Sequence, residues 1–488
     1  MFSIVLCILL CFVFNFWWKR KCYDPHGPPI HPGALPIIGN AHQFLGDGLK
    51  LWKFLKELSY FSLKCGGVST VYLGPLHRIY IVTDPDDCLT LSNACLDKPF
   101  IYDIVKEWAN NGLITADVSI WKPHRKLLNP MFNQKILHEN LEIFNSQARR
   151  LVEQMSVELE KGKFATHKYI VSNSQETVCQ IILNLTSDTF DDVIKGYSKA
   201  TQDLLDVFIA KSQKLWLHIP FIFKRSSYKK KLDRSIEITT AILNRVIQNQ
   251  KAELKKSNFT VNPNRAVTFL DLMLTLQETQ GSFTDDDIRE HLDQLAFTAF
   301  DTTTETLTFG LKLIGSNERV QQRIYEELKE VLGDTNADVS RYDLPQLVYL
   351  DAVVREILRT YSTVPFAARK ILKDIKLKNY TLRANSIGAI SVFGIHRHPI
   401  WGADVEEFRP ERWLEPSLAF NDNPSLFAAF SLGKRNCIGK WYAMISIKTT
   451  LAHLLRHYRL YADDKKMTVK FDVSIRAIAG HEISLERR

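Results

Sequence analysis

Cys437 lies in the stretch F-S-L-G-K-R-N-C-I-G, which runs from Phe430 to Gly439. Gly433 permits a tight turn, and Gly439 leaves room where the start of a following helix must approach a flat group. Backbone N–H groups at a helix N-terminus favour a thiolate over a thiol. A lone cysteine is more often an inert small hydrophobe. In this setting, however, the stretch predicts a thiolate suited to be an axial haem ligand, with Arg435 able to pair with a haem carboxylate.

A long helix is predicted to begin at Thr284, where T-D-D-D forms a capping box with acidic charge in the first turn. Within it, Asp301 is followed by three threonines, which are poor helix formers and can bond back to helix carbonyls. An acid followed by an alcohol can deliver the two protons that activation of bound dioxygen requires. For an isolated run a polar helix face is the plainer interpretation, but beside the stretch around Cys437 we consider Asp301 and Thr302 candidate catalytic residues.

Two shorter patterns place charged side chains on helix faces. Glu356 and Arg359 are three residues apart, and Trp121 and Arg125 are four residues apart, so each pair shares a helix face. Both patterns are common by chance, and either alone is consistent with an exposed pair. Elsewhere we expect two strands between Val68 and Val82 about a turn at Gly74-Pro75, helices over most of the remaining chain, and a polar loop over residues 251–265.

Taken together and in this order, these motifs resemble the cytochrome P450 superfamily over the whole chain. The stretch around Cys437 matches the haem-binding signature F-x-x-G-x-R-x-C-x-G at every fixed position. The resemblance implies a mainly α fold with a smaller β-rich part near the N-terminus, folded as a single large domain. It also implies haem b (iron protoporphyrin IX) with a cysteine thiolate as axial ligand.

The resemblance assigns roles to residues at matching positions. Cys437 is the metal ligand, and the other expected cofactor-binding residues are Trp121, Arg125, Ala299, Arg369, Phe430, Arg435 and Gly439. Asp301 and Thr302 are the acid–alcohol pair, with Ala299 beside the oxygen groove. Arg412, in F-R-P-E-R-W, joins Glu356 and Arg359 in a buried ionic triad that serves folding and haem retention. Phe300, Val364 and Phe366 are expected to line the substrate pocket.

The N-terminus is predicted to be a membrane anchor. Residues 1–18 are almost wholly apolar, and a helix of this length spans ~27 Å, close to a thin bilayer. Three basic residues follow it, whereas a signal peptide, the alternative, carries its positive charge first. Residues 19–40 form a basic and proline-rich linker, and residues 41–488 the catalytic domain. We therefore expect the endoplasmic reticulum membrane, with the catalytic domain on the cytosolic side.

The segment from His291 to Thr303 resembles the helix signature of the family-four branch, best known for ω-hydroxylating fatty acids. That branch often carries a glutamate that can esterify the haem, and Thr298 stands at its position. We therefore expect haem that is not ester-linked to the protein. Ala299 replaces the usual glycine and Phe300 follows it, so the pocket is expected to differ from that for the usual fatty acids, as in divergent insect-like members.

The net charge of +9 is dispersed and accompanies no nucleic-acid recognition motif, so we expect no nucleic-acid partner. Anionic lipid or an acidic protein fits this charge better. The apolar stretch from Leu215 to Phe223 is framed by lysines and an arginine, which is typical of a segment that dips into a membrane interface. A core segment with a solvated tail is the alternative.

The resemblance implies a membrane-bound monooxygenase that inserts one atom of dioxygen into a small apolar substrate. The chain has no G-x-G-x-x-G motif, so electrons are expected from NADPH–cytochrome P450 reductase, with cytochrome b5 as a possible second donor. Four lysines that flank the expected thiolate side are candidate contacts for an acidic reductase, and charges that serve only solubility are the alternative: Lys122, Lys126, Lys434 and Lys440. Two alternatives remain open: a haem-thiolate isomerase or dehydratase of peroxides, and a noncatalytic haem-binding carrier.

Overall fold

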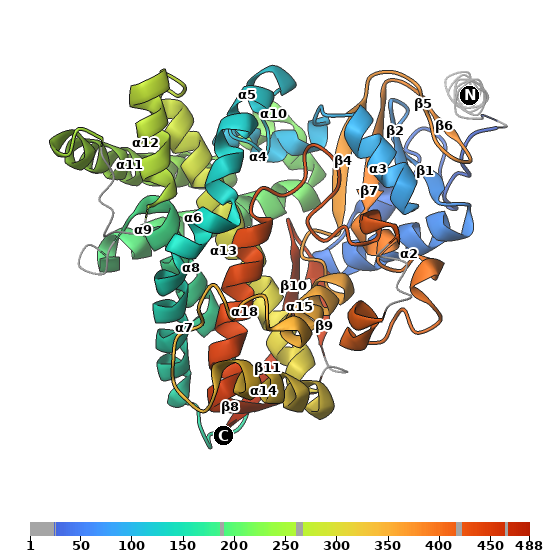
Figure 1. The fold of residues 1–488 in the computed structure, drawn as a ribbon. Helices are drawn as coiled ribbons and strands as arrows, with labels where there is room; N and C mark the ends of the chain where they lie inside the picture. Colours follow the sequence, from blue (N-terminus) through green and yellow to red (C-terminus); the bar gives the residue numbers. More distant parts are fainter. Residues whose placement is uncertain (1–23, 25, 186–189, 260–266, 416–421, 464–466) are drawn as a thin grey trace, which may run out of the picture. The chain divides into compact units, whose positions relative to one another are not determined.

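A computed structural model describes Asp24 and residues 26–185, 190–259, 267–415, 422–463 and 467–488 (Figure 1). The predicted anchor, residues 1–18, lies outside this part of the chain, as does the beginning of the predicted linker. Among the described residues, no helix has the length and apolar character needed to cross a membrane. The fold is mainly α with a smaller β-rich part, which confirms the predicted fold class.

The chain divides into two compact units. The β-rich unit comprises Met1–Ile101, Val364–Glu407 and Ala419–Asn436. The helical unit comprises Tyr102–Thr363, Phe408–Leu418 and Cys437–Arg488.

The β-rich unit is built on a four-stranded sheet in the order β1-β2-β7-β4. The strands are β1 (Val68–Leu73), β2 (His77–Val82), β4 (Phe366–Ile371) and β7 (Ser386–Ser391). β1 and β2 form the predicted hairpin, β2 pairs with β7 in parallel, and β4 returns antiparallel to β7. The unit also contains α2 (Gly48–Lys64), α3 (Pro85–Ala94), α16 (Val392–Ile395) and the short pair β5 (Ile375–Lys376) and β6 (Thr381–Leu382).

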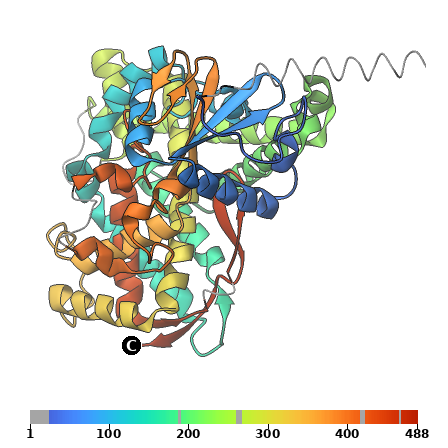
Figure 2. The same ribbon diagram turned by 90° about the vertical axis from the view of Figure 1, so that its right-hand side faces the viewer.

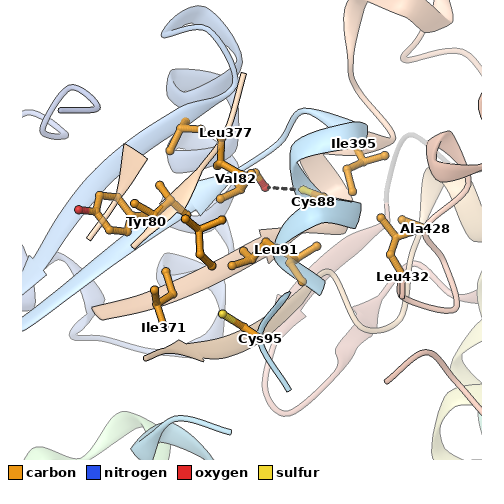
Figure 3. Close-up of a cluster of buried hydrophobic side chains, with 14 of the residues drawn as sticks. Tyr80, Val82, Cys88, Leu91, Cys95, Ile371, Leu377, Ile395, Ala428 and Leu432 are labelled. Atoms are coloured by element: carbon orange, nitrogen blue, oxygen red, sulfur yellow. Dashed lines mark hydrogen bonds between the residues drawn. The ribbon is translucent and has the colours of Figure 1, made fainter. Parts of the chain in front are cut away.

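One apolar cluster forms a core of the β-rich unit (Figure 3). It joins side chains of the sheet, such as Val82, to Leu91 on α3 and to Leu432 near the end of the unit. The Cys88 thiol, also buried there, donates a hydrogen bond to the carbonyl oxygen of Val82 over 3.3 Å. The segment that leads to Cys437 is thus anchored by burial of apolar surface.

The helical unit contains most of the described helices. They are α4 (Asp103–Ala109), α5 (Val118–Leu128), α6 (Gln134–Glu139), α7 (Leu141–Ser156), α8 (His167–Leu183), α9 (Phe190–Gln213), α10 (Pro220–Arg225), α11 (Ser227–Lys256), α12 (Phe269–Gln280), α13 (Asp285–Gly315), α14 (Glu318–Leu332), α15 (Val348–Thr360) and α18 (Lys440–His457). The polar loop predicted over residues 251–265 is wrong for its first part, because α11 continues to Lys256.

α13 is the central helix of the helical unit, packed against α8, α11, α15 and α18 (Figure 1). It begins as predicted: Thr284 accepts from the backbone N–H of Asp287, and the Asp287 carboxylate accepts from the N–H of Thr284. Between His291 and Ile314 every residue is buried except Thr298, Ala299 and Thr302. A helix buried over so much of its surface is held by tertiary packing more than by propensity.

The C-terminal strands of the helical unit were not predicted from sequence. β8 (Tyr458–Tyr461) and β3 (Phe164–Ala165) pair with β11 (Glu482–Arg487), seen in dark red beside the C-terminus in Figure 2. β9 (Thr468–Phe471) and β10 (Ile475–Ala479) form a separate antiparallel pair. Through β10 and the residue before it, this hairpin brings Ser474 and Arg476 to α13.

Candidate active site

Cys437 stands three residues before α18, which begins at Lys440. The cysteine is exposed at the surface, yet protein surrounds its thiol closely enough for burial to raise its pKa above the ordinary value. The backbone N–H of Gly439 and the charges of Arg125 and Lys440 act in the opposite direction. The predicted stabilisation of the thiolate is therefore present, but it does not outweigh desolvation in the free protein.

The turn before Cys437 depends on glycine. Gly433 has a φ of +68°, in the left-handed region that disfavours other residues. A side chain there would also place its Cβ atom 2.7 Å from the Cβ atom of Ser92, within the same β-rich unit. Sequence reasoning predicted the turn, whereas the close approach to α3 is visible only in the structure.

Trp121 and Arg125 lie on α5, as the pattern predicted. Trp121 is buried at 5% exposure, so the pair is not the exposed surface pair of the alternative. Burial lowers the pKa of Arg125, and its Nε donates to the side-chain oxygen of Asn129 over 2.6 Å. Arg125 is close enough to Cys437 for each charge to act on the other.

Thr298, Ala299 and Thr302 form one partly open face of α13 in an otherwise buried stretch. The hydroxyl of Thr302 donates to the carbonyl oxygen of Thr298 over 2.8 Å, and that of Thr298 donates to the carbonyl of Gln294 over 2.8 Å. Such back-bonding satisfies the hydroxyls within the helix and leaves its face uncharged. Phe300, expected in the substrate pocket, is 9% exposed, and its ring lies 5.9 Å from that of Phe297.

Asp301 points to a different part of the helical unit. Its Oδ1 accepts from Nη2 of Arg476, and its Oδ2 accepts from the hydroxyl of Ser474 over 2.9 Å. Burial raises the pKa of Asp301, while the Arg476 charge acts to lower it. No hydrogen bond joins the Asp301 carboxylate to Thr302 among the contacts of the described chain. The expected acid and alcohol are therefore neighbours in sequence with separate partners.

The structure brings Glu356, Arg359 and Arg412 together. Nε and Nη2 of Arg359 each donate to Glu356 over 2.8 Å, and Nε of Arg412 donates to it over 3.0 Å. All three side chains are at most 1% exposed. Burial acts to raise the pKa of Glu356, but the hydrogen bonds and charge of Arg359, with that of Arg412, hold it below the ordinary value. Trp413 adds an indole N–H to the same carboxylate over 2.9 Å.

The remaining expected site residues belong to the β-rich unit. Arg369 on β4 and Arg435 are buried, at 1% and 8% exposure. Phe430 is half-buried, with its ring 6.2 Å from that of Phe427. Phe366 is half-buried at the start of β4, and Val364 just before it is exposed. Buried guanidinium groups generally require anionic or hydrogen-bonding partners, which suits the expected role of both arginines.

Comparison with known proteins decides the family. The cytochrome P450 family model matches residues 28–480, a range that spans both units. This chain is a cytochrome P450. The two units are accordingly parts of one cytochrome P450 domain.

Similar curated proteins belong to family four of the cytochromes P450. Cytochrome P450 4V2 of Mus musculus is 28% identical over 486 residues, which cover 96% of this chain and 92% of the relative. A probable cytochrome P450 4s3 of Drosophila melanogaster is 32% identical over 440 residues, covering 88% and 86%. Cytochrome P450 4c21 of Blattella germanica is 29% identical over 387 residues, covering 78% and 77%. Membership supports a haem-thiolate monooxygenase.

The donor set of this cytochrome P450 fits a haem thiolate. The sulfur of Cys437 receives a backbone N–H and lies in the field of Arg125, so both a ligand atom and a nearby cation are present. Metal coordination deprotonates a thiol outright, which overcomes the raised pKa of Cys437. The face formed by Thr298, Ala299 and Thr302 carries no ionisable side chain, as an apolar oxygen site requires.

Sequence reasoning missed the partners of Asp301. Arg476 and Ser474 lie more than 170 residues away in the chain, and no local pattern marks them. Glu305 is different: it lies one helical turn after Asp301, so the 3.6-residue period alone places both carboxylates on one face of α13. That signal was available and was not used.

Proposed function

We propose that this cytochrome P450 is a membrane-bound monooxygenase that inserts one oxygen atom into an apolar substrate and reduces the other to water. The observation that carries the proposal is the combination, in one family domain, of the Cys437 loop with α13 and its Asp301-Thr302 pair. When bound, haem supplies dioxygen binding and reductive O–O cleavage, assisted by electron donation from the axial thiolate.

The residues expected to hold haem b are those assigned from sequence. Cys437 would ligate the iron, and Trp121, Arg125, Arg369 and Arg435 would bind the two propionates, because a planar guanidinium matches a carboxylate. The haem would not be ester-linked. Thr298 has no carboxylate to esterify, and its hydroxyl is already bonded to a helix carbonyl.

Asp301 and Thr302 would supply protons to reacting oxygen. The Thr302 hydroxyl lies on the partly open face of α13. Its single proton is donated to the carbonyl oxygen of Thr298, so it would donate to reacting oxygen only after releasing that carbonyl. Asp301 is buried away from bulk water, so its proton must come through its own contacts. Ala299 keeps the face small enough for gas and substrate.

The segment from Leu215 to Phe223 is proposed to dip into the membrane surface. Four of its apolar residues are exposed: Trp216 at 54%, Ile219 at 50%, Phe221 at 65% and Ile222 at 39%. Leu217 and Phe223 are buried at 2% and 6%, so the segment is anchored on the helical unit while it presents an apolar surface. Exposed apolar residues framed by cations favour an anionic lipid interface.

Electrons are proposed to come from NADPH through cytochrome P450 reductase, with cytochrome b5 as a possible second donor. Lys122, Lys126, Lys434 and Lys440 are exposed and available to an acidic partner. The membrane would be that of the endoplasmic reticulum. The substrate class proposed is a lipid, terpenoid, hormone-like compound or xenobiotic, because the chain resembles family four but carries Ala299, followed by bulky Phe300, at the position of the usual glycine of that branch.

Reconstitution with the reductase, NADPH and lipid vesicles tests the proposal on a panel of fatty acids, terpenoids, steroids and foreign compounds. A carbon monoxide difference spectrum first establishes thiolate ligation, and a Cys437→Ser variant should lose the thiolate-type Soret band. We expect NADPH-dependent oxygen uptake with hydroxylated product. A peroxide isomerase or dehydratase would turn over without reductase, and a carrier would bind ligands without turnover, so either result refutes the proposal.

A further inference from the structure

Four ionisable side chains of the helical unit form one group, called here the Asp301 cluster: Asp301, Glu305, Arg476 and His167. Nη2 of Arg476 donates to Asp301, and its Nη1 lies 3.6 Å from Oε1 of Glu305. The same Oε1 lies 3.2 Å from Nε2 of His167, the first residue of α8. Arg476 is therefore shared between two carboxylates that lie one turn apart on α13.

The charges of the Asp301 cluster do not balance. With both carboxylates ionised and the imidazole neutral, one guanidinium faces two carboxylates, and the cluster carries a net charge of −1. Oε2 of Glu305 is buried and has no hydrogen-bond partner among the described residues. A buried carboxylate without full compensation is strongly unfavourable. One bound proton makes the cluster neutral.

The proton can occupy either carboxylate or the imidazole of His167, whose Nε2 lies 3.2 Å from Glu305. When Glu305 is neutral, Arg476 pairs with Asp301, and when Asp301 is neutral, Arg476 can pair with Glu305. The raised pKa of Asp301 has burial as its main cause and the charge of Glu305 as a contributor, and it is consistent with such sharing.

His167 is the most exposed side chain of the cluster, so it is the member through which protons can enter from solvent. Glu305, Asp301 and Arg476 are 1%, 6% and 15% exposed, whereas His167 is 34% exposed. His481 lies beside His167 with ring centroids 6.2 Å apart, and Lys312 and Glu482 are the other charges near it. Lys312 and Glu482 are opposite in sign, so they leave the charge of the cluster unchanged.

We propose that the Asp301 cluster stores one proton for the oxygen chemistry and is refilled from solvent through His167. This inference rests on the proposed function, in which dioxygen, substrate R–H, two electrons and two protons give R–OH and water. The electrons come from NADPH through the redox partner. The O–H bond of neutral Asp301 breaks to supply one of the two protons, and a proton from the imidazolium of His167 then forms an O–H bond on Glu305. In this scheme Glu305, Arg476 and His167 are positioning residues that act through Asp301.

The first test measures proton storage in the resting holoenzyme, without turnover. Infrared difference spectra report the C=O stretching band of a neutral carboxyl group. We expect this band in the wild type and its loss in E305Q, because Arg476 then compensates Asp301 alone. The matched control is E176Q: Glu176 is a buried carboxylate on α8 that pairs with Arg150 outside the cluster. Retention of the neutral-carboxyl band in E305Q overturns the proposal.

The second test measures proton delivery during turnover, as the ratio of product to NADPH consumed and the solvent isotope effect on product formation. E305Q should lower the ratio at least threefold. H167Q should keep the infrared band but increase the solvent isotope effect, because storage remains while refilling slows. The matched control is H138Q. His138 is also a partly buried histidine, but it lies on α6 and is not a member of the Asp301 cluster. The proposal fails if H167Q shows the wild-type isotope effect and the wild-type ratio of product to NADPH. This test of H167Q remains decisive if E305Q does not retain haem and cannot be assayed.

The two proposals fail in different ways. A wild-type protein without NADPH-dependent oxygen uptake refutes the proposed function, and the infrared comparison still decides whether the cluster stores a proton. A wild-type protein that turns over, with both variants indistinguishable from their controls, refutes only the proton store.

Discussion

Replacing Glu356 with glutamine is expected to destabilise the protein by about 3–5 kcal/mol, because it leaves two buried guanidinium groups without their counter-charge. The carboxylate of Glu356 accepts hydrogen bonds from the guanidinium groups of Arg359 and Arg412, the backbone N–H of Arg409 and the indole of Trp413. Glutamine keeps the volume of the side chain, so the effect isolates charge and acceptors from packing.

The size of the expected loss of stability in E356Q follows from the burial and the hydrogen-bond geometry of the triad. Glu356 and Arg359 are 0% exposed and Arg412 is 1% exposed, so water cannot replace the lost carboxylate. Glutamine offers one acceptor oxygen, and its NH2 group would face N–H donors. Each buried donor left unsatisfied costs about 1–3 kcal/mol, which agrees with the range for breaking a buried pair.

The assay compares urea midpoints followed by loss of the haem Soret band and by far-ultraviolet circular dichroism. The matched control is E415Q, because Glu415 pairs with Arg409 nearby but is 41% exposed. Exposed pairs contribute at most about 1 kcal/mol, so this variant should unfold near the wild-type midpoint.

A pH series adds a second check. The pKa of Glu356 is lowered in the folded protein, so its stabilisation is complete above the unfolded value of about 4.3 and is lost as the pH falls through the folded value. The difference between wild type and E356Q should therefore shrink only below about pH 4. A midpoint for E356Q equal to that of E415Q would refute the reasoning, since the triad would then contribute nothing beyond a surface pair.

Three further changes have defined outcomes. Burial raises the pKa of Asp293 to about 6, so the contribution of Asp293 to stability should fall by about 3 kcal/mol as the pH rises from 4 to 6, and D293N should remove this contribution from the pH slope in urea titrations. G433A should lower the urea midpoint by an amount equivalent to about 1–3 kcal/mol, because a positive φ and a contact of 2.7 Å both oppose a Cβ atom. Replacing Trp216 and Phe221 by serine should weaken sedimentation with anionic vesicles at least tenfold, since each exposed ring contributes about 1.5–3 kcal/mol on burial in lipid.

Two of these changes have a matched control. Gly162 also has a positive φ, of +84°, but no atom lies within 4 Å of an added Cβ, so G162A separates backbone strain from steric contact. Tyr342 is 67% exposed, and Y342S should leave vesicle binding unchanged. An unaltered pH slope in D293N, equal losses in G433A and G162A, or unchanged binding of the double serine variant would contradict the respective argument.

Local signals predicted the elements that are specified locally. The β1–β2 hairpin follows from alternating apolar residues about Gly74, and the start of α13 follows from the capping box at Thr284. The C-terminal strands are only four to six residues long and were missed, because their pairing joins distant segments such as β3 and β11. The end of α11 was placed too early, because its polar last turns resemble a loop when their packing is unknown.

The same contrast between local and long-range signals applies to the candidate active site. The Cys437 loop could be found from sequence because its turn, cation and helix start are close in the chain. The partners of Asp301 could not, because Arg476 reaches it only when β10 is packed against α13. The order of the motifs was enough to indicate the family. The buried charges around Asp301 could be identified only in the folded chain.

α13 shows how one helix can carry several polar sites without losing its order. Asp293 accepts from the indole of Trp108 over 2.6 Å and from the hydroxyl of Tyr197 over 2.8 Å, which ties α13 to α4 and α9. Eight residues later, about 12 Å along the axis, Asp301 is held by β10. Between them Thr298 bonds only within the helix. Asp293, Asp301 and Thr298 are thus each satisfied by a neighbouring element or by the helix itself. The polar residues of α13 therefore specify its neighbours, and the same contacts leave Thr298, Ala299 and Thr302 as its one open face between His291 and Ile314.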